Sequence, residues 1–518
     1  MIWYRSLMNP AAYPHPVRDV RHLATHISDV FLTGPFAYKI KKPVDLKFLD
    51  FSTLEKRRYY CEREVTLNRR LAPEIYIGVV PITRDGENFR MEGKGEPVEY
   101  AVKMVQFGQE GLLDAMAGRG ELKRDHILDL AERVARFHQS AERADDVFGT
   151  PEVVGENVLR NFEQTAKYQG VVVSPERFSR LRTYSERFLK DRTGLFRKRI
   201  ESGAIRVCHG DLHLQNICLD HGRLIIFDCI EFNDSLNHID VVNEIAFLLM
   251  DLDHRGYSGL GSRFLNAYLE RTQDYEGLAM QDFYLIYRAC VRAKVACFLL
   301  EDPDITEEEK KAAKERASAY FELAERYLDN HRPGLFLMAG VSGSGKSTVA
   351  SDLAEGLGGV MVRSDAVRKS IAELGQEARA SVDYGRGIYS QEMTERTYDG
   401  LLERAEAVIA SGRWAILDAT YAQRQHRLSA RSWAEKRGVP FGILYCTAPL
   451  SVLETRLSQR VAAGKDVSDA DIEIMRRQRA VFEPFDREEA EYLVQVDTEK
   501  QWDREALVKA CRKRASSH

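Results

Sequence analysis

The sequence lacks the features of a membrane-embedded or disulfide-bonded protein. No stretch approaches the run of about 18 apolar residues that a membrane-spanning helix needs. The first sixteen residues, MIWYRSLMNPAAYPHP, hold no continuous apolar core of a signal peptide. The eight cysteines form no C-x-x-C pair and no metal-ligand spacing. We therefore expect a cytoplasmic protein with reduced thiols and no membrane partner.

An excess of charge of one sign is also lacking. The 75 lysines and arginines nearly balance the 79 acidic residues, which leaves a formal net charge of −4. This balance gives no global reason to expect binding to nucleic acid or to a membrane surface, although it does not exclude a local basic groove. The 518 residues, 44% hydrophobic and 30% charged, are enough for two or three globular domains.

The first part of the chain reads as short strands followed by many helices. Two apolar runs joined by Thr33-Gly34-Pro35 predict a hairpin, and a helical pattern covers residues 52–72, with Ser52 or Thr53 as its cap. Helical spacing dominates from residue 125 onward, and His138 falls on the apolar face of the first such helix. Two short strands are expected around residues 209–228, and EIAFLLMDL, residues 244–252, is expected to be a buried helix.

The pattern changes at Pro333-Gly334, where we place a domain boundary. After it, the apolar runs LFLMAG, GVMVRSD, WAILDAT, FGILYCTA and YLVQVDT alternate with helical stretches. Such alternation predicts a parallel sheet flanked by helices.

The segment HGDLHLQN, residues 209–216, carries the first chemical motif. It places Asp211 and Asn216 on one loop, and Asp228 follows at the end of the strand-like LIIFD. Phosphoryl transfer needs a group that orients the nucleophile and oxygen ligands for Mg²⁺. Asp211 is suited to accept a proton from a substrate hydroxyl, while Asn216 and Asp228 are suited to bind Mg²⁺.

These residues make the first half similar to the aminoglycoside phosphotransferase and choline-kinase branch of the protein-kinase-like fold. The resemblance covers roughly residues 20–330 and implies an α+β domain over 1–332, with an N-lobe of about 1–106 and a C-lobe of about 107–332. It implies that Lys39 contacts the ATP phosphates and that Glu64 pairs with it, with Lys41 as a possible substitute for Lys39. One departure is that no G-x-G-x-x-G loop is present, only Gly34 in LTGPF.

The segment GVSGSGKST, Gly340 to Thr348, carries the second motif. It fits G-x-x-x-x-G-K-[ST], follows an apolar strand and precedes a helical pattern. Gly340, Gly343 and Gly345 let backbone N–H groups face phosphates, Lys346 reaches the β- and γ-phosphates, and Ser347 and Thr348 begin the helix, with Ser347 as a Mg²⁺ ligand. The motif predicts an ATP or GTP site in an α/β P-loop domain over residues 333–518.

The residues after this loop resemble those of the polynucleotide-kinase and zeta-toxin-like P-loop kinases, over roughly residues 334–500. In VRSDAVRKSI the resemblance implies that Asp365 accepts the proton of a substrate hydroxyl and that Arg368 holds a phosphate. Asp418, at another strand end, is expected near Mg²⁺. Arg456 and Arg460 lie in residues 454–471, a stretch that resembles a mobile lid. The resemblance implies that both arginines stabilise the transferring phosphoryl group. The alternative is that they lie on a solvated face of a helix.

The whole chain thus resembles bacterial fusions described as bifunctional aminoglycoside phosphotransferase/ATP-binding proteins. The expected function is ATP- and Mg²⁺-dependent phosphate transfer to a hydroxyl by each domain. Two alternatives stay open: a kinase for the 5′-OH end of RNA or DNA, and a P-loop kinase regulated by a nucleotide-sensing pseudokinase. The acceptor of the first half is open as well. A cationic acceptor would suit an acidic set of residues, namely Asp234, Asp240, Asp251 and Asp253. An anionic acceptor would suit a basic set, namely Arg288, Arg292 and Lys294.

Overall fold

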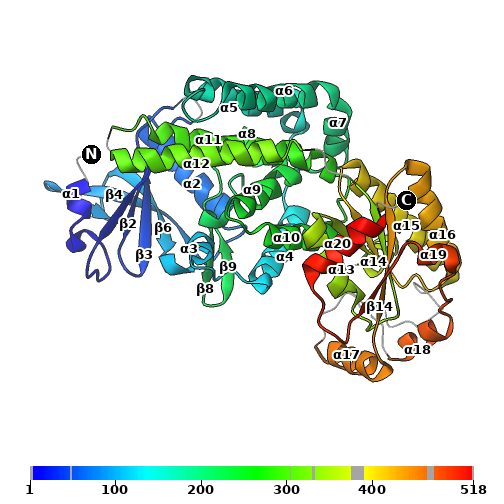
Figure 1. Cartoon of the computed structure of the whole chain (residues 1–518). Helices are drawn as coiled ribbons and strands as arrows, with labels where there is room; N and C mark the ends of the chain where they lie inside the picture. Colours follow the sequence, from blue (N-terminus) through cyan, green and yellow to red (C-terminus); the bar gives the residue numbers. More distant parts are fainter. Residues whose placement is uncertain are drawn as a thin grey trace. The chain divides into compact units, whose positions relative to one another are not determined.

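A computed structural model describes residues 4–46, 49–303, 305–329, 333–374, 390–463 and 472–515. The chain divides into two compact units (Figure 1). The first unit contains Met1–Asp129, Arg136–Arg255 and Phe283–Tyr327, and the second contains Leu130–Ala135, Gly256–Asp282 and Leu328–His518. Each unit carries one of the two sequence motifs.

The first unit begins with an antiparallel six-stranded sheet in the order β1-β2-β3-β6-β4-β5. The strands are β1 (Arg21–Ala24), β2 (Ser28–Leu32), β3 (Phe36–Lys41), β4 (Tyr76–Asp85), β5 (Asn88–Met91) and β6 (Pro97–Val105). The predicted hairpin is confirmed as β2–β3, in which Leu32 faces Ala37. Helix α2 (Leu54–Asn68) packs on β4 and β6, and the Thr53 hydroxyl caps it by accepting a hydrogen bond from the Lys56 N–H.

The remainder of the first unit is mainly helical. Its longer helices are α4 (Arg124–Ser140), α5 (Pro151–Thr165), α6 (Pro175–Asp191), α7 (Thr193–Glu201), α9 (Val241–His254), α11 (Leu278–Leu299) and α12 (Glu307–Arg326), of which α4 and α11 each have a segment in the second unit. Two short antiparallel sheets interrupt them: β7 (Ile205–Val207) with β10 (His238–Asp240), and β8 (Ile217–Asp220) with β9 (Arg223–Ile226). The expected strands around residues 209–228 are therefore confirmed. Helix α9 is buried from Val241 to Leu252, as its apolar sequence predicts, and His138 is buried in α4.

The second unit is built on a parallel five-stranded sheet in the order β12-β13-β11-β14-β15. The strands are β11 (Leu335–Ala339), β12 (Val360–Arg363), β13 (Ala415–Asp418), β14 (Phe441–Thr447) and β15 (Leu493–Asp497), one for each predicted apolar run. The chain leaves the central strand β11 toward one edge and returns to its other side at β14. Ligands of such sheets bind at the carboxyl ends of the strands where this reversal occurs.

Helices cover both faces of this sheet and bury its core. Helices α13 (Lys346–Leu357) and α20 (Arg504–Ala515) pack together over a cluster that includes Phe336, Leu353 and Trp414. Helices α14 (Ser364–Ile371), α15 (Gln391–Ala410), α16 (Arg424–Arg437), α17 (Leu450–Ala463) and α18 (Ile472–Ala480) complete the layers. Residues 464–471 of the expected lid lie outside the described residues.

Helix α10 (Ser258–Thr272) also belongs to the second unit, although it ends 88 residues before β12, the strand on which it packs. It packs on α13 and β12. Its Arg263 pairs with Asp352 and with Glu355 (2.9 Å), and its Asn266 Oδ1 accepts a hydrogen bond from the Met361 N–H (2.6 Å). A helix from the middle of the chain therefore contributes to the P-loop sheet's outer layer.

All eight cysteines are buried and free. Over the part of the chain that the structure describes, no helix has both the length and the apolar character needed to cross a membrane.

Candidate functional site

The loop between β7 and β8 holds Asp211 and Asn216 against each other. The Asn216 side-chain amide donates to the Asp211 Oδ2 (2.9 Å) and to the Asp211 carbonyl (3.0 Å), and His213 Nε2 lies 3.2 Å from the same carboxylate oxygen. Burial alone would raise the pKa of Asp211, but His213, His209 and Arg292 outweigh it and hold the pKa below its usual range. Asp211 is therefore an ionised carboxylate in a fixed orientation.

His209 supports this loop from beneath. Its ring is fully buried, and its Nδ1 accepts a hydrogen bond from the Asp211 N–H (3.2 Å). Since a backbone N–H can only donate, the ring proton sits on Nε2, which lies 2.8 Å from the Phe227 carbonyl and donates to it. The ring thus connects the Asp211 loop to the residue that precedes Asp228.

Asp228 follows β9 in a backbone conformation that non-glycine residues rarely adopt. Its φ is 68°, and its N–H donates to the Tyr76 hydroxyl (3.1 Å). The carboxylate accepts a hydrogen bond from Lys39 Nζ (2.5 Å) and is 44% exposed. Strained residues of this kind are concentrated at functional sites, and Asp228 points its oxygens toward the lysine expected to contact phosphates.

Two lysines of β3 share one glutamate. Glu64 Oε1 lies 2.9 Å from Lys39 Nζ, Glu64 Oε2 lies 2.7 Å from Lys41 Nζ, and Lys41 also pairs with Glu231. Burial would lower the pKa of each lysine, but the surrounding carboxylates raise both above their usual value, so both lysines stay charged. The Lys39 side chain is 14% exposed and that of Lys41 only 1%. This difference favours Lys39, rather than Lys41, as the lysine that reaches a ligand.

The acidic and basic sets proposed for substrate binding in this half serve mostly as internal supports. Asp240 forms a buried pair with Arg199, and Asp251 accepts a hydrogen bond from the Leu214 N–H in the loop that carries Asp211 (3.0 Å). Arg288 donates to the Gly210 carbonyl (3.1 Å). In addition, Asp253 accepts a hydrogen bond from the Tyr327 hydroxyl and Asp234 pairs with Arg63, while Arg292 donates to Gln215 and Lys294 is half-buried. Asp240, Asp251 and Arg288, offered as alternatives for contacting the acceptor, cannot face an open pocket, because each is buried and engaged.

In the second unit, the loop after β11 depends on its glycines. Gly340 has a φ of 136°, and a Cβ there would lie 2.5 Å from the Cys446 carbonyl. Gly345 has a φ of 81°, and a Cβ would lie 3.2 Å from the Thr498 Cβ. Gly343 also has a positive φ, 81°. Side chains at these positions would strain the backbone or push neighbouring atoms away.

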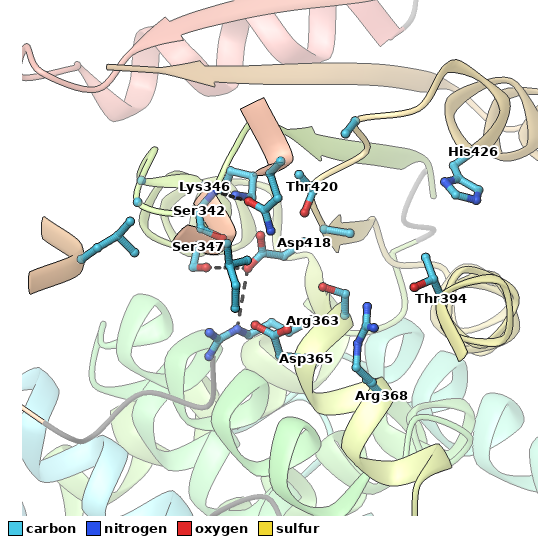
Figure 2. A pocket seen from close by; sticks show the side chains of 18 of the residues that line it. Ser342, Lys346, Ser347, Arg363, Asp365, Arg368, Thr394, Asp418, Thr420 and His426 are labelled. Atoms are coloured by element: carbon cyan, nitrogen blue, oxygen red, sulfur yellow. Dashed lines mark hydrogen bonds and ion pairs between the residues drawn. The ribbon is translucent and has the colours of Figure 1, made fainter. Parts of the chain in front are cut away.

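Lys346, Ser347 and Asp418 meet at the carboxyl ends of β11 and β13 (Figure 2). Ser347 Oγ donates to Asp418 Oδ2 (2.6 Å), and Lys346 Nζ donates to the Val341 carbonyl (2.9 Å). Burial lowers the pKa of Lys346 below its usual value, and Asp418 opposes that effect. Thr348 lines the same cavity one residue further along α13.

The remaining predicted residues of this half surround the same cavity, which has a volume of about 310 Å³. Asp365 and Arg368, in the first two turns of α14, line it opposite the glycine loop (Figure 2). Arg456 and Arg460 of α17 line it too. Arg456 donates to the Thr498 hydroxyl (2.9 Å) and carbonyl (2.6 Å), so it is not a freely solvated side chain.

Two family models match the chain. One, described as the phosphotransferase enzyme family, matches residues 104–280, and one described as an AAA domain matches residues 335–485. The uncharacterized protein Rv2004c of Mycobacterium tuberculosis is 33% identical over 460 residues, which are 88% of this chain and 89% of that protein. The uncharacterized protein Mb2027c of Mycobacterium bovis matches equally well. The chain belongs to the same protein family as these two mycobacterial proteins. It joins an N-terminal phosphotransferase-like half to a C-terminal P-loop half, as expected, and two kinase-type domains in one chain indicate a phosphotransferase.

Solved structures resemble parts of the chain more distantly. A choline/ethanolamine kinase family protein from Mesorhizobium loti is 12% identical, with a TM-score of 0.35, and covers 61% of this chain and 93% of its own. A putative kinase from Chloroflexus aurantiacus is 23% identical, with a TM-score of 0.28, and covers 36% of this chain and 99% of its own.

The sequence reasoning missed Glu244 in the phosphotransferase-like half. Its Oε1 accepts a hydrogen bond from the His209 N–H and its Oε2 from the Gly210 N–H, both at 2.7 Å, and His138 Nε2 lies 3.6 Å from Oε1. The available signal was that a carboxylate directly precedes the apolar run IAFLLM in a stretch expected to be a buried helix, since buried acids are rare unless they are paired.

The P-loop half contains a missed arginine as well. Arg363, at the end of β12, places its Nε 3.7 Å from Asp418 Oδ2 and donates from Nη1 to Glu270 of α10 (2.9 Å). It lines the cavity beside Ser347 and Asp365 (Figure 2). Arg363 lies in the quoted VRSDAVRKSI, but nothing near it in the sequence reveals its partner Glu270.

Proposed function

We propose that the chain is a bifunctional ATP-dependent phosphotransferase in which each half transfers the γ-phosphate of ATP to an acceptor hydroxyl. The observation that carries the proposal is that each half gathers, within one site, a lysine for phosphates, oxygen donors for Mg²⁺ and a carboxylate that can accept a proton. Phosphoryl transfer depends on positioning and charge stabilisation by these three kinds of group.

In the phosphotransferase-like half, the proton acceptor is Asp211. Its carboxylate is ionised and held by Asn216, so it can orient a hydroxyl and accept its proton. Lys39 is charged and partly exposed, which suits contact with phosphate oxygens. Glu64 fixes its direction.

The oxygen donors of both halves fit Mg²⁺, a hard cation that prefers oxygen ligands. In the first half, the amide nitrogen of Asn216 is used by Asp211, which leaves its Oδ1 and the exposed carboxylate of Asp228 for a metal. In the second half, Ser347 Oγ and Asp418 Oδ2 lie 2.6 Å apart beside the glycine loop. Bound Mg²⁺ would neutralise charge on the β- and γ-phosphate oxygens.

In the P-loop half, Asp365 is the proposed proton acceptor and Lys346 the phosphate contact. Arg368, Arg456 and Arg460 supply positive charge around the same cavity, where a transferring phosphoryl group would lie. The glycine loop and the start of α13 add backbone N–H groups that favour anions.

Transfer of label from γ-labelled ATP tests the proposal. Acceptors would be a metabolite extract and, separately, 5′-OH RNA and DNA oligonucleotides, with wild type, Asp211→Ala and Lys346→Ala compared. We expect two labelled products, each lost in one variant, with a loss on the order of 100-fold or more. The exposed Lys436→Ala and the half-buried Asp220→Ala are matched controls that should retain both products.

The regulatory alternative gives a different result in the same experiment. If the phosphotransferase-like half only senses nucleotide, every labelled product would disappear with Lys346→Ala and none with Asp211→Ala. No labelled product in wild type, despite nucleotide binding, would contradict the proposal for both halves.

A further inference from the structure

A second hollow of about 280 Å³ lies beside the nucleotide cavity of the P-loop half. It lies between α15 and α16 and the segment after β13, and two residues, Tyr398 and His426, line both cavities. Their rings stack at 3.9 Å with an interplanar angle of 15°. The stacked pair therefore forms a shared wall, and a ligand in the hollow would be adjacent to the phosphate site.

Tyr421 provides a hydrogen-bonding group in this hollow that the protein does not use. Its side chain is 1% exposed, and its hydroxyl has no hydrogen-bond partner among the described residues. Burial raises the pKa of the phenol well above its usual value, so the hydroxyl stays protonated. Its φ is 43°, and its N–H donates to the Tyr398 hydroxyl (3.2 Å). A buried hydroxyl without a hydrogen-bond partner destabilises the fold, and a ligand that pairs with this hydroxyl recovers that free energy.

The charges of the hollow select against polyanions. Its lining contains two carboxylates, Glu395 and Asp399, together with Gln425, and no lysine or arginine is among the described residues that line it. Glu395 lies 3.3 Å from His426 Nε2 and accepts a hydrogen bond from Gln425 (3.2 Å). Carboxylates, an amide and phenols bind hydroxyl and amino groups well, whereas a phosphodiester chain would be repelled here.

We propose that this hollow is the acceptor pocket of the P-loop half and that it takes a small, uncharged or cationic compound with several hydroxyl or amino groups. The inference rests on the proposed kinase function and names the substrate class of that site. Tyr421 and Glu395 would bind one end of the acceptor, and the stacked Tyr398 and His426 would cover its middle. The reacting hydroxyl would extend past Thr394 into the cavity that Asp365 and Lys346 line (Figure 2).

The acceptor oxygen forms a bond to the γ-phosphorus of ATP, and its proton passes to the Asp365 carboxylate. The bond between the γ-phosphorus and the β,γ-bridging oxygen breaks, and ADP leaves with that electron pair. No oxidant, reductant or further reactant is needed.

The test uses the full chain carrying Asp211→Ala, so that transfer reports the P-loop half. γ-Labelled ATP is offered with neutral sugars and sugar alcohols, with amino sugars, and with 5′-OH RNA and DNA oligonucleotides. We expect label in a small acceptor and none in oligonucleotides, with all of it lost on adding Lys346→Ala. Label that enters oligonucleotides but no small acceptor overturns this inference and leaves the kinase proposal intact. If no acceptor is labelled, both this inference and the proposed kinase activity of the P-loop half are overturned.

Two pocket variants then locate the acceptor. Tyr421→Phe removes the unpaired hydroxyl, so we expect the KM for the acceptor to rise about tenfold, the KM for ATP to stay unchanged and the melting temperature to stay equal or rise. Glu395→Gln should raise the same KM. Glu406→Gln, on the same helix α15 but paired with Arg437 outside the hollow, is the control that should leave both KM values unchanged. An unchanged acceptor KM in both pocket variants overturns the assignment.

Discussion

At the scale of single residues, Glu244 supports the Asp211 loop of the phosphotransferase-like half. Its two carboxylate oxygens accept hydrogen bonds from the successive N–H groups of His209 and Gly210. A glutamine would place an NH₂ group against one of those donors. We expect Glu244→Gln to destabilise this half by about 2–4 kcal/mol and to reduce Asp211-dependent transfer at least tenfold. Thermal unfolding and label transfer measure the two effects, and the exposed Glu186→Gln should change neither.

The pH dependence of the same variant separates this role from simple packing. Burial raises the pKa of Glu244, but His138 and His209 and the backbone N–H group outweigh burial and lower it from 4.5 to about 2. Because the folded-state pKa is depressed, the carboxylate contributes stability above about pH 4.5, worth about 3 kcal/mol, and loses it as the pH falls toward 2. The gap in stability between wild type and Glu244→Gln should therefore narrow over this range. A gap that stays constant would contradict an ionised Glu244.

Sequence reasoning at this scale succeeded where residues are neighbours in a motif. Asp211 and Asn216 share one loop, and Lys346, Ser347 and the glycines share another, so local spacing was enough to place them together. It failed for Glu244 and Arg363, because each acts through a partner more than 30 residues away. Nor could spacing show that Asp251 and Arg288 support the Asp211 loop instead of facing a substrate.

At the scale of elements, helix α10 extends the P-loop site. Glu270 in its last turns holds Arg363, which lies next to the Ser347–Asp418 pair. We expect Glu270→Gln to loosen Arg363 and to lower transfer by the P-loop half about three- to tenfold, with the larger effect at low Mg²⁺, because Asp418 loses its fixed cationic neighbour. Initial rates over a Mg²⁺ titration measure this effect.

The matched control for this prediction is Glu276→Gln, an exposed glutamate just beyond α10. It should leave the rate of the P-loop half unchanged. Equal rates for Glu270→Gln and wild type at every Mg²⁺ concentration would show that α10 only covers the sheet and does not position Arg363.

The elements themselves were largely predictable, but their partners were less so. Five apolar runs became the five strands β11 to β15, since buried parallel strands read as continuous apolar segments. The helical pattern of α10 shows that one face is apolar, yet it cannot show which surface that face covers. Arg263 and Asn266 find their partners on α13 and around β12, and only the folded chain reveals this.

At the scale of the whole molecule, the chain holds two proposed ATP sites that are built on unrelated folds. The first places a lysine on an antiparallel sheet and its proposed metal ligands on separate loops, while the second combines a glycine loop with a helix N-terminus. The two sites share none of these residues, so each should bind nucleotide by itself.

This independence predicts a binding stoichiometry of two. We expect the full chain to bind about two molecules of a non-hydrolysable ATP analogue in the presence of Mg²⁺, as measured by equilibrium dialysis. Lys39→Ala removes the cation that faces Asp228, and Lys346→Ala removes the cation of the glycine loop, so each variant should bind about one molecule and the double variant none. Lys436→Ala should keep both sites. One molecule bound by wild type and lost only with Lys346→Ala would limit nucleotide binding to the P-loop half, and it would leave the charged Lys39–Glu64–Lys41 cluster as a support for the sheet alone.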